Sequence, residues 1–112
     1  MSKNLLEKEI ERKLRILVET RLGGRCLKWV CPGWSGVPDR ILLLPGGRVF
    51  FVELKRPKGG RVDPLQAWWK RQLEGLGFTV WHIHTVEQLN YFDLILTDEI
   101  TRREGEHKNA RN

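Results

Sequence analysis

The chain has 112 residues, with 20 lysines and arginines against 14 acidic residues, a net charge of +6. This length predicts one domain with one core and excludes separate catalytic and recognition modules. The positive charge favours a polyanionic partner such as nucleic acid. No run approaches the roughly 20 apolar residues of a membrane span, and the N-terminus lacks the apolar core of a signal peptide, so we expect a cytoplasmic protein without a membrane partner.

The first half of the chain is predicted to contain one helix and three strands. Apolar residues recur at helical spacing over residues 4–21, and Gly23-Gly24 follows as a C-terminal stop. A strand is predicted at 25–30, followed by a loop rich in glycine and proline. Strands at 39–44 and 48–55 flank a Pro45-Gly46-Gly47 turn and predict a β-hairpin.

A helix and a fourth strand are predicted next. Asp63-Pro64 supplies an N-cap and a first-turn proline for a helix that runs to Leu76. A strand follows at 78–84. Helical periodicity predicts that the buried stripe of this helix consists of Leu65, Trp69, Leu73 and Leu76.

The last predicted helix opens at a capping box formed by Thr85 and Gln88 and runs through about Leu96. Residues 102–112 have no apolar periodicity, so we expect a mobile polar tail after a single domain at 1–101. The predicted order of elements is therefore α-β-β-β-α-β-α.

Two carboxylates and a lysine interrupt the apolar strands of the hairpin. If the turn is centred on Gly46, Asp39 lies opposite Glu53, and Lys55 shares the face of Glu53. At roughly 4 Å and an effective dielectric of about 20, two ionised carboxylates repel by about 4 kcal/mol, so the pair must share a proton, separate or bind a cation. A hard divalent cation is the favoured partner, and the lysine would orient a water or stabilise a phosphate.

The alternative for these charges is a cross-strand ion pair on a solvated face. Apolar residues alternate on both sides of the second hairpin strand, with Phe51 on one side and Phe50, Val52 and Leu54 on the other. Both faces are therefore expected to be covered, which disfavours a solvated ion pair.

These residues resemble the signature of the PD-(D/E)XK nucleases. The wider sequence is similar to the VRR-NUC (virus-type replication-repair nuclease) branch at Gly23-Gly24, Lys28-Trp29, Gly36 to Arg40, Phe51 to Lys55, Gln66 and Leu76 to Phe78. The resemblance implies an α/β restriction-endonuclease-like fold, with a mixed central sheet flanked by helices. It also implies a metal-dependent DNA endonuclease of DNA repair, acting on branched DNA such as Holliday junctions and leaving a 5′-phosphate and a 3′-hydroxyl.

The resemblance further implies which groups hold Mg²⁺ or Mn²⁺. These are the carboxylates of Asp39 and Glu53 and the backbone carbonyl of Leu54, with Lys55 assisting the attacking water. Whether one or two metals act stays open.

Two catalytic residues are expected on helices. Related nucleases supply one acidic ligand from the first helix, and the pattern Glu-x-x-Ile-Glu favours Glu7 over Glu11, against the alternative of a solvated acidic stripe. Gln66, in the first turn of the second helix, is expected to reach the phosphate or the metal-bound water rather than point into solvent.

The DNA-binding residues are expected to be cations and one aromatic side chain around the site: Lys28, Trp34, Arg40, Arg56, Lys58 and Arg61. The alternative for the last three is a solvated basic turn. Trp34 lies in a glycine-rich loop and is expected to stack on an unpaired base. Trp68 and Trp69 are better explained as core or interface residues.

A zinc site and a disulfide framework are both disfavoured. Cys26 and Cys31 are the only cysteines, and with His82 and His84 they match no common zinc spacing. Buried or half-buried thiols and imidazoles at the edge of the sheet are the simpler interpretation.

We expect a symmetric homodimer, because cutting both strands of a junction requires two active sites related by a two-fold axis. The last helix has more apolar residues than one buried stripe needs: Leu89, Tyr91, Phe92, Leu94, Ile95 and Leu96. The alternative is that one chain buries both faces.

For function, the alternatives are a flap or restriction-like nuclease of the same fold, for which no sequence-reading element is evident, and a catalytically idle DNA-binding module. The expected location is the cytoplasm of a bacterial or virus-infected cell.

Overall fold

The computed structural model describes residues 3–56, 59 and 61–111, and the side chains of 6–56, 59 and 61–102. The predicted order of elements is confirmed. The first helix ends in a π-helical turn, η1, and the elements along the chain are α1 (Lys3–Ile16), η1 (Leu17–Arg21), β1 (Arg25–Lys28), β2 (Arg40–Leu44), β3 (Arg48–Glu53), α2 (Pro64–Gly75), β4 (Thr79–His82) and α3 (Val86–Arg111).

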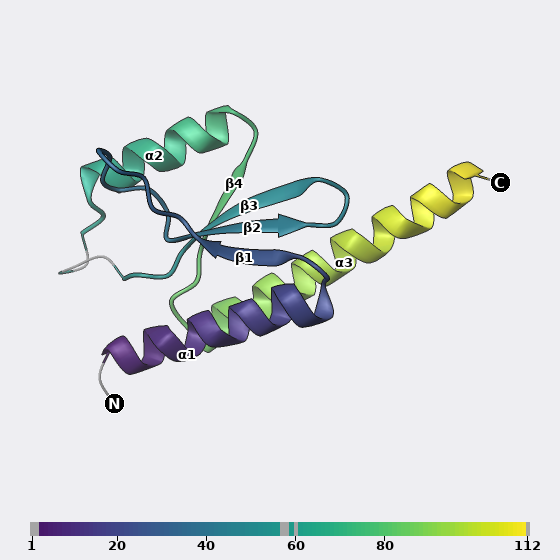
Figure 1. The fold of residues 1–112 in the computed structure, drawn as a ribbon, viewed down its shortest axis with the longest axis horizontal. Helices are drawn as coiled ribbons and strands as arrows, with labels where there is room; N and C mark the ends of the chain where they lie inside the picture. The colour runs from purple at the N-terminus through teal and green to yellow at the C-terminus, as the bar shows by residue number, and fades with distance from the viewer. Residues whose placement is uncertain (1–2, 57–58, 60, 112) are drawn as a thin grey trace.

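The four strands form one mixed sheet in the order β1-β2-β3-β4. The first three strands pair antiparallel, and β4 pairs parallel to β3. Helices α1 and α3 lie side by side along one face of the sheet, and α2 lies on the other (Figure 1). This is the mixed sheet flanked by helices that the sequence predicted.

The register of the hairpin is the one that the sequence predicted. Arg40 pairs with Val52 and Ile41 with Phe51, so the next step of the ladder brings residues 39 and 53 to the same end of the hairpin. Gly46 and Gly47 make the turn with φ values of 82° and 75°, a conformation that glycine adopts at little cost.

Both faces of β3 are buried, as the alternation of its apolar residues predicts. Val52 is fully buried among residues of α1, η1 and α3 such as Leu14 and Phe92. Phe51 packs on the opposite face with Val80 and with residues of α2. The charged residues at the end of this strand therefore come directly after a segment that is covered on both faces.

Both predicted helix caps are present. The Asp63 side chain accepts a hydrogen bond from the Leu65 amide at 2.8 Å. Thr85 accepts one from the Gln88 amide at 3.1 Å, and the Gln88 side chain accepts from the Thr85 amide at 3.2 Å. Because each cap satisfies amides that a helix start leaves unpaired, these local sequences define where α2 and α3 begin.

The predicted buried stripe of α2 is only partly right. Leu73 is buried, but Leu65 is 44% exposed and Leu76 is 75% exposed. The contacts of α2 are mainly to β4, so only the central part of its apolar stripe reaches the sheet. The start of α2 therefore presents apolar side chains to solvent.

The expected end of the last helix near Leu96 was wrong, because α3 continues to Arg111 and crosses the predicted boundary at residue 101. Residues 102–111 contain mainly good helix formers such as arginine, glutamate, lysine and alanine, which extend a helix without an apolar stripe. In Figure 1, α3 projects beyond the sheet.

None of the described helices combines the length and apolar character that crossing a membrane requires.

Candidate active site

Asp39 lies immediately before β2 and links the two strands of the hairpin. One of its oxygens, Oδ2, accepts hydrogen bonds from the amides of Leu54 at 2.8 Å and Lys55 at 3.0 Å. Its other oxygen lies 3.9 Å from the Lys55 ammonium. Burial alone would raise the pKa of Asp39, but its interaction with Glu53 and these backbone amides outweigh burial, so the pKa lies below its usual value.

Glu53 is the last residue of β3 and is 4% exposed. Burial and the neighbouring Asp39 carboxylate raise the pKa of Glu53 to about 9. Two carboxylates side by side thus retain one proton near neutral pH. The oxygen Oε1 of Glu53 is buried and has no hydrogen-bond partner among the described residues, which makes it a donor atom that a cation would satisfy.

Gln66 lies in the first turn of α2 and donates a hydrogen bond from its amide nitrogen to Oε2 of Glu53 at 3.3 Å. The sequence placed this glutamine near the phosphate or the water. In the structure its partner is the buried carboxylate, so it holds the side chain of Glu53 in place.

His84 joins the site although the sequence did not assign it a role there. Its ring nitrogen Nδ1 lies 3.1 Å from the carbonyl oxygen of Leu54. Because a carbonyl oxygen only accepts hydrogen bonds, Nδ1 carries the proton. The same peptide group donates through the Lys55 amide to Asp39, so one peptide plane connects the imidazole after β4 to the carboxylate before β2.

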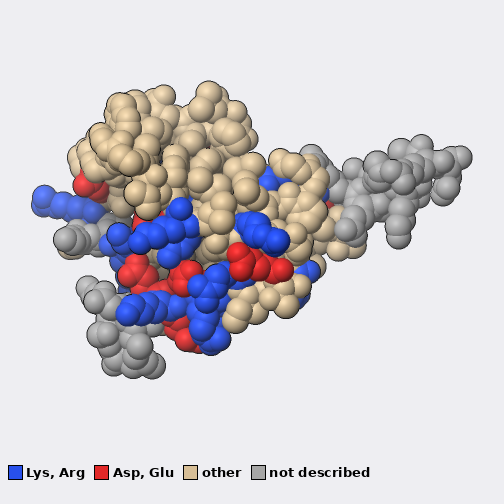
Figure 2. Space-filling model, in the orientation of Figure 1, with Lys and Arg blue, Asp and Glu red and all other residues tan. Residues whose placement is uncertain are grey.

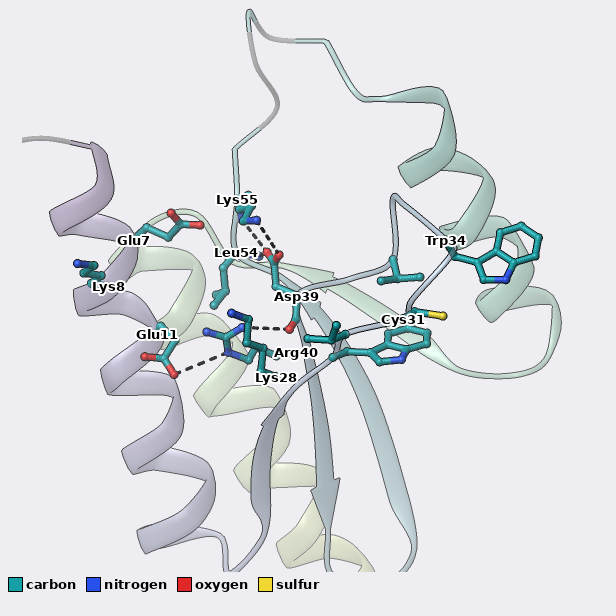
Figure 3. Close-up of a pocket in the computed structure, with 13 residues that line it drawn as sticks. Glu7, Lys8, Glu11, Lys28, Cys31, Trp34, Asp39, Arg40, Leu54 and Lys55 are labelled. Carbon is teal, nitrogen blue, oxygen red and sulfur yellow. Dashed lines mark hydrogen bonds and ion pairs between the residues drawn. The ribbon is translucent and has the colours of Figure 1, made fainter.

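A cleft of about 450 Å³ opens between α1, the β1–β2 loop and the end of the hairpin. Asp39, Leu54 and Lys55 line its centre, and both candidate glutamates of α1 line one side (Figure 3). Glu11 is engaged there, because its carboxylate lies 3.7 Å from Arg40 and 3.5 Å from Arg15. Glu7 makes no ion pair with any other described side chain. Of the two glutamates, it is therefore the one whose carboxylate is not already paired with an arginine.

The predicted basic residues lie in different surroundings. Lys28 and Arg40 line the cleft, and so does Lys8, which the sequence did not single out. Figure 2 shows basic and acidic side chains intermixed over the region of α1 and the strand ends. Arg56 donates to the carbonyl of His84 at 3.2 Å.

Of the remaining predicted DNA contacts, only Trp34 is among the described residues that line the cleft. Arg61 is exposed, and Lys58 falls outside the residues that the structure describes. Trp34 lines the cleft at the side opposite Glu7 (Figure 3).

The described residues contain no group of three histidine, cysteine or acidic side chains arranged to hold a metal. Both cysteines are free, and burial raises the pKa of the Cys26 thiol to about 11. This agrees with the expected absence of a disulfide.

Comparison with known proteins identifies the family. The chain is 42% identical over 74 residues to the protein named "Putative nuclease p44" of Acyrthosiphon pisum secondary endosymbiont phage 1, a match that covers 66% of this chain and 77% of the phage protein. A solved structure described as a VRR_NUC domain superposes with a TM-score of 0.68 at 28% identity, over 77% of this chain and 91% of that one. The chain is a VRR-NUC domain. No protein-family model matches its sequence.

The proton on the carboxylate pair of this VRR-NUC domain predicts how its metal-free stability depends on pH. Since the pKa of Glu53 rises on folding from 4.5 to about 9, the folded state keeps a proton that the unfolded state releases, and stability falls as pH rises through this window. Glu53→Gln replaces the titrating carboxyl with an amide, so it should remove this pH-dependent loss of stability. The free energy of unfolding of Glu53→Gln minus that of wild type should be larger at pH 8 than at pH 5. The increase should be at least about 1.4 kcal/mol, the equivalent of one pKa unit.

Urea unfolding in EDTA at pH 5 and pH 8 measures this difference. The control is Glu87→Gln, which neutralises an exposed carboxylate in the first turn of α3. If the difference in free energy of unfolding between Glu53→Gln and wild type is the same at pH 5 and pH 8, the carboxylate pair does not keep an extra proton in the folded state.

Proposed function

We propose that this VRR-NUC domain is a Mg²⁺- or Mn²⁺-dependent endonuclease that hydrolyses phosphodiester bonds in DNA. The observation that carries the proposal is the pair of a partly buried carboxylate, Asp39, and a buried one, Glu53, which has an oxygen without a partner among the described residues. A buried pair of acidic groups destabilises the metal-free fold, and a hard cation relieves that cost.

The metal ligands that fit are Asp39, Glu53 and the carbonyl of Leu54, whose second lone pair remains available beside the hydrogen bond from His84. Glu7 is the favoured ligand from α1, directly or through a water, because Glu11 is paired with two arginines. The ion would supply Lewis-acid stabilisation of the phosphate and lower the pKa of a bound water.

The protein's own groups account for positioning and charge. Lys55 places an exposed ammonium 3.9 Å from Asp39, where it can orient a water or stabilise charge on the phosphate. Gln66 and His84 hold the side chain of Glu53 and the Leu54 peptide. Lys8 and Lys28 add positive charge along the cleft for the phosphates that flank the cut.

We further propose branched DNA, such as a Holliday junction, as the substrate. A panel of continuous duplex, flap, splayed and four-way-junction DNA, each assayed with Mg²⁺, with Mn²⁺ and with EDTA, tests both parts. Cleavage that needs the metal and favours the four-way junction is the expected result. Cleavage in EDTA would contradict the metal-dependent mechanism, and preference for flap or continuous duplex DNA would support a flap or restriction-like nuclease. Binding without cleavage under all conditions would support an idle DNA-binding module.

A symmetric homodimer is part of the proposal. Leu89, Phe92 and Leu96 are buried within the chain, but Tyr91 is 58% exposed and Leu94 is 71% exposed, so α3 keeps a second apolar face. A two-fold contact through this face would bury these side chains and pair two active sites on one junction. Because the relative is a phage protein, we propose that the dimer acts in the cytoplasm of a bacterial or virus-infected cell.

The mass in solution tests the dimer. Light scattering at micromolar concentration should give about twice the 13.2 kDa of one chain, and Leu94→Asp should give the single-chain mass because a charge at this face opposes its burial. The control is Leu76→Asp, at an equally exposed position after α2. A mass of one chain for wild type, both free and bound to a junction, would rule the dimer out.

A further inference from the structure

Two tryptophans form an ordered pair beside the cleft. The rings of Trp34, in the β1–β2 loop, and Trp68, in α2, are parallel to within 1°, with centroids 6.2 Å apart. Trp69 stands at nearly a right angle to both, with centroids 5.7 Å and 5.0 Å away. Its ring nitrogen donates to the Ser35 carbonyl at 3.1 Å, which ties the loop to α2.

The β1–β2 loop is also held at Gly36. This glycine has a φ of 86°, and a Cβ atom there would lie 2.7 Å from the backbone of Leu65. The loop and the first turn of α2 are therefore in direct backbone contact, and the orientation of Trp34 is set by packing rather than left to a free loop.

Neither member of the pair is needed by the core. Trp29 and Trp69 pack against the buried residues beneath α2, whereas Trp34 is 57% exposed and Trp68 is 37% exposed. Val30, which lines the same cleft as Trp34, is 69% exposed. Large apolar side chains gathered on a surface indicate a binding site when they adjoin a functional cleft.

One member of the pair, Trp34, lines the cleft that also contains the charged residues. Trp34 lines the same cleft as Asp39 and Lys55, and it lies across that cleft from Glu7 (Figure 3). The charged surface over α1 gives way to a largely uncharged surface over α2 (Figure 2). Cations beside a carboxylate pair suit a phosphate, and an exposed indole beside them suits the face of a base.

We propose that Trp34 and Trp68 form a stacking platform for an unpaired base next to the phosphate that is cut, and that this platform selects branched over continuous DNA. The proposal rests on the proposed nuclease function and names how the same site recognises its substrate. In a continuous duplex the faces of the bases are covered by their neighbours, whereas a branch point exposes one. Stacking accepts any base, so the platform reads structure rather than sequence.

Binding measured without cleavage tests the platform. All proteins carry Asp39→Asn, and the probes are a splayed duplex with 2-aminopurine at the first unpaired nucleotide and a continuous duplex of the same sequence. The parent should quench the fluorescence of the splayed probe and bind it more tightly than the duplex. Trp34→Leu and Trp68→Leu, which keep apolar packing on Trp69, should lose the quenching and about tenfold in affinity for the splayed probe alone.

Two further variants separate stacking from folding. Trp34→Phe keeps an aromatic face and should bind the splayed probe more tightly than Trp34→Leu does. Leu76→Ala, which shortens an exposed apolar side chain after α2, should change neither quenching nor affinity. Quenching by Trp34→Leu equal to that of the parent, or equal loss of affinity for both probes, would overturn the platform. A change from dimer to monomer in Trp34→Leu with unchanged discrimination between the probes would also overturn it and assign the pair to a protein interface.

The outcomes keep the two proposals distinguishable. If quenching depends on Trp34 but the wild-type protein, with Asp39 intact, cuts no DNA with any metal, the platform stands and the nuclease mechanism is removed. Metal-dependent cleavage by the wild-type protein, together with DNA binding that does not depend on Trp34, would support the nuclease mechanism and overturn the platform. If the parent does not bind DNA, both proposals are overturned.

Discussion

Asp39→Asn should abolish DNA cleavage while leaving the fold and DNA binding intact. In the proposed mechanism Asp39 is one of the metal ligands, and its loss would remove Lewis-acid stabilisation worth several kcal/mol. We therefore expect the rate of a single turnover at saturating Mg²⁺ to fall by about 10³-fold or more. The substitution is conservative for the structure, because the amide oxygen of asparagine can accept the two hydrogen bonds from Leu54 and Lys55 that the carboxylate accepts now.

Asp39→Ala separates this chemical role from the structural one. It leaves the partly buried amide of Leu54 and the exposed amide of Lys55 without their acceptor. The unpaired Leu54 amide should destabilise the protein by about 1 to 3 kcal/mol beyond any effect on cleavage. Asp98→Asn, at an exposed position on α3, is the control. Cleavage by Asp39→Asn at the wild-type rate, with its fold confirmed by circular dichroism, would remove Asp39 from the metal site.

The pairing of Asp39 with Glu53 was predictable because it depends on short-range rules. Two apolar runs joined by a glycine turn fix the register of a hairpin, and the alternation of side chains then fixes which residues share a face. The observed pairing of Arg40 with Val52 follows that register. The carboxylate pair was therefore readable from the sequence without knowledge of the remaining fold.

The contacts of Gln66 and His84 were not predictable in the same way. They require that β4 pair parallel to β3 and that α2 cross the sheet at one place, and neither arrangement is encoded within a short segment. The sequence thus predicted a site role for the glutamine but not its contact with Glu53, and it assigned the histidine only a buried or half-buried environment.

The surface of α2 shows a different limit of helical periodicity. The pattern predicts which residues share a face, but the area of that face that is buried depends on how much sheet lies beneath it. Here α2 covers mainly β4, so Leu65 and Trp68 remain partly exposed, and the pair with Trp34 could not be derived from spacing alone.

Lys55→Ala should reduce turnover far more than DNA binding. Lys55 is 70% exposed and lies 3.9 Å from Asp39, so its ammonium can reach a water or phosphate at the carboxylate pair without supporting the fold. Removal of a charge that acts on the transition state should lower kcat by about 10²-fold or more. Binding should change by no more than one phosphate contact, which is about 0.9 in the slope of log K against log salt.

Arg61→Ala is the matched control, because it removes an exposed cation that follows β3 without touching the carboxylate pair. It should lower the salt slope by up to the same amount and leave kcat at saturating DNA unchanged. Single-turnover cleavage and binding titrations at three salt concentrations measure both quantities. If Lys55→Ala lost affinity and salt slope but kept kcat, Lys55 would be a phosphate contact and the chemical step would depend on the carboxylate pair without it.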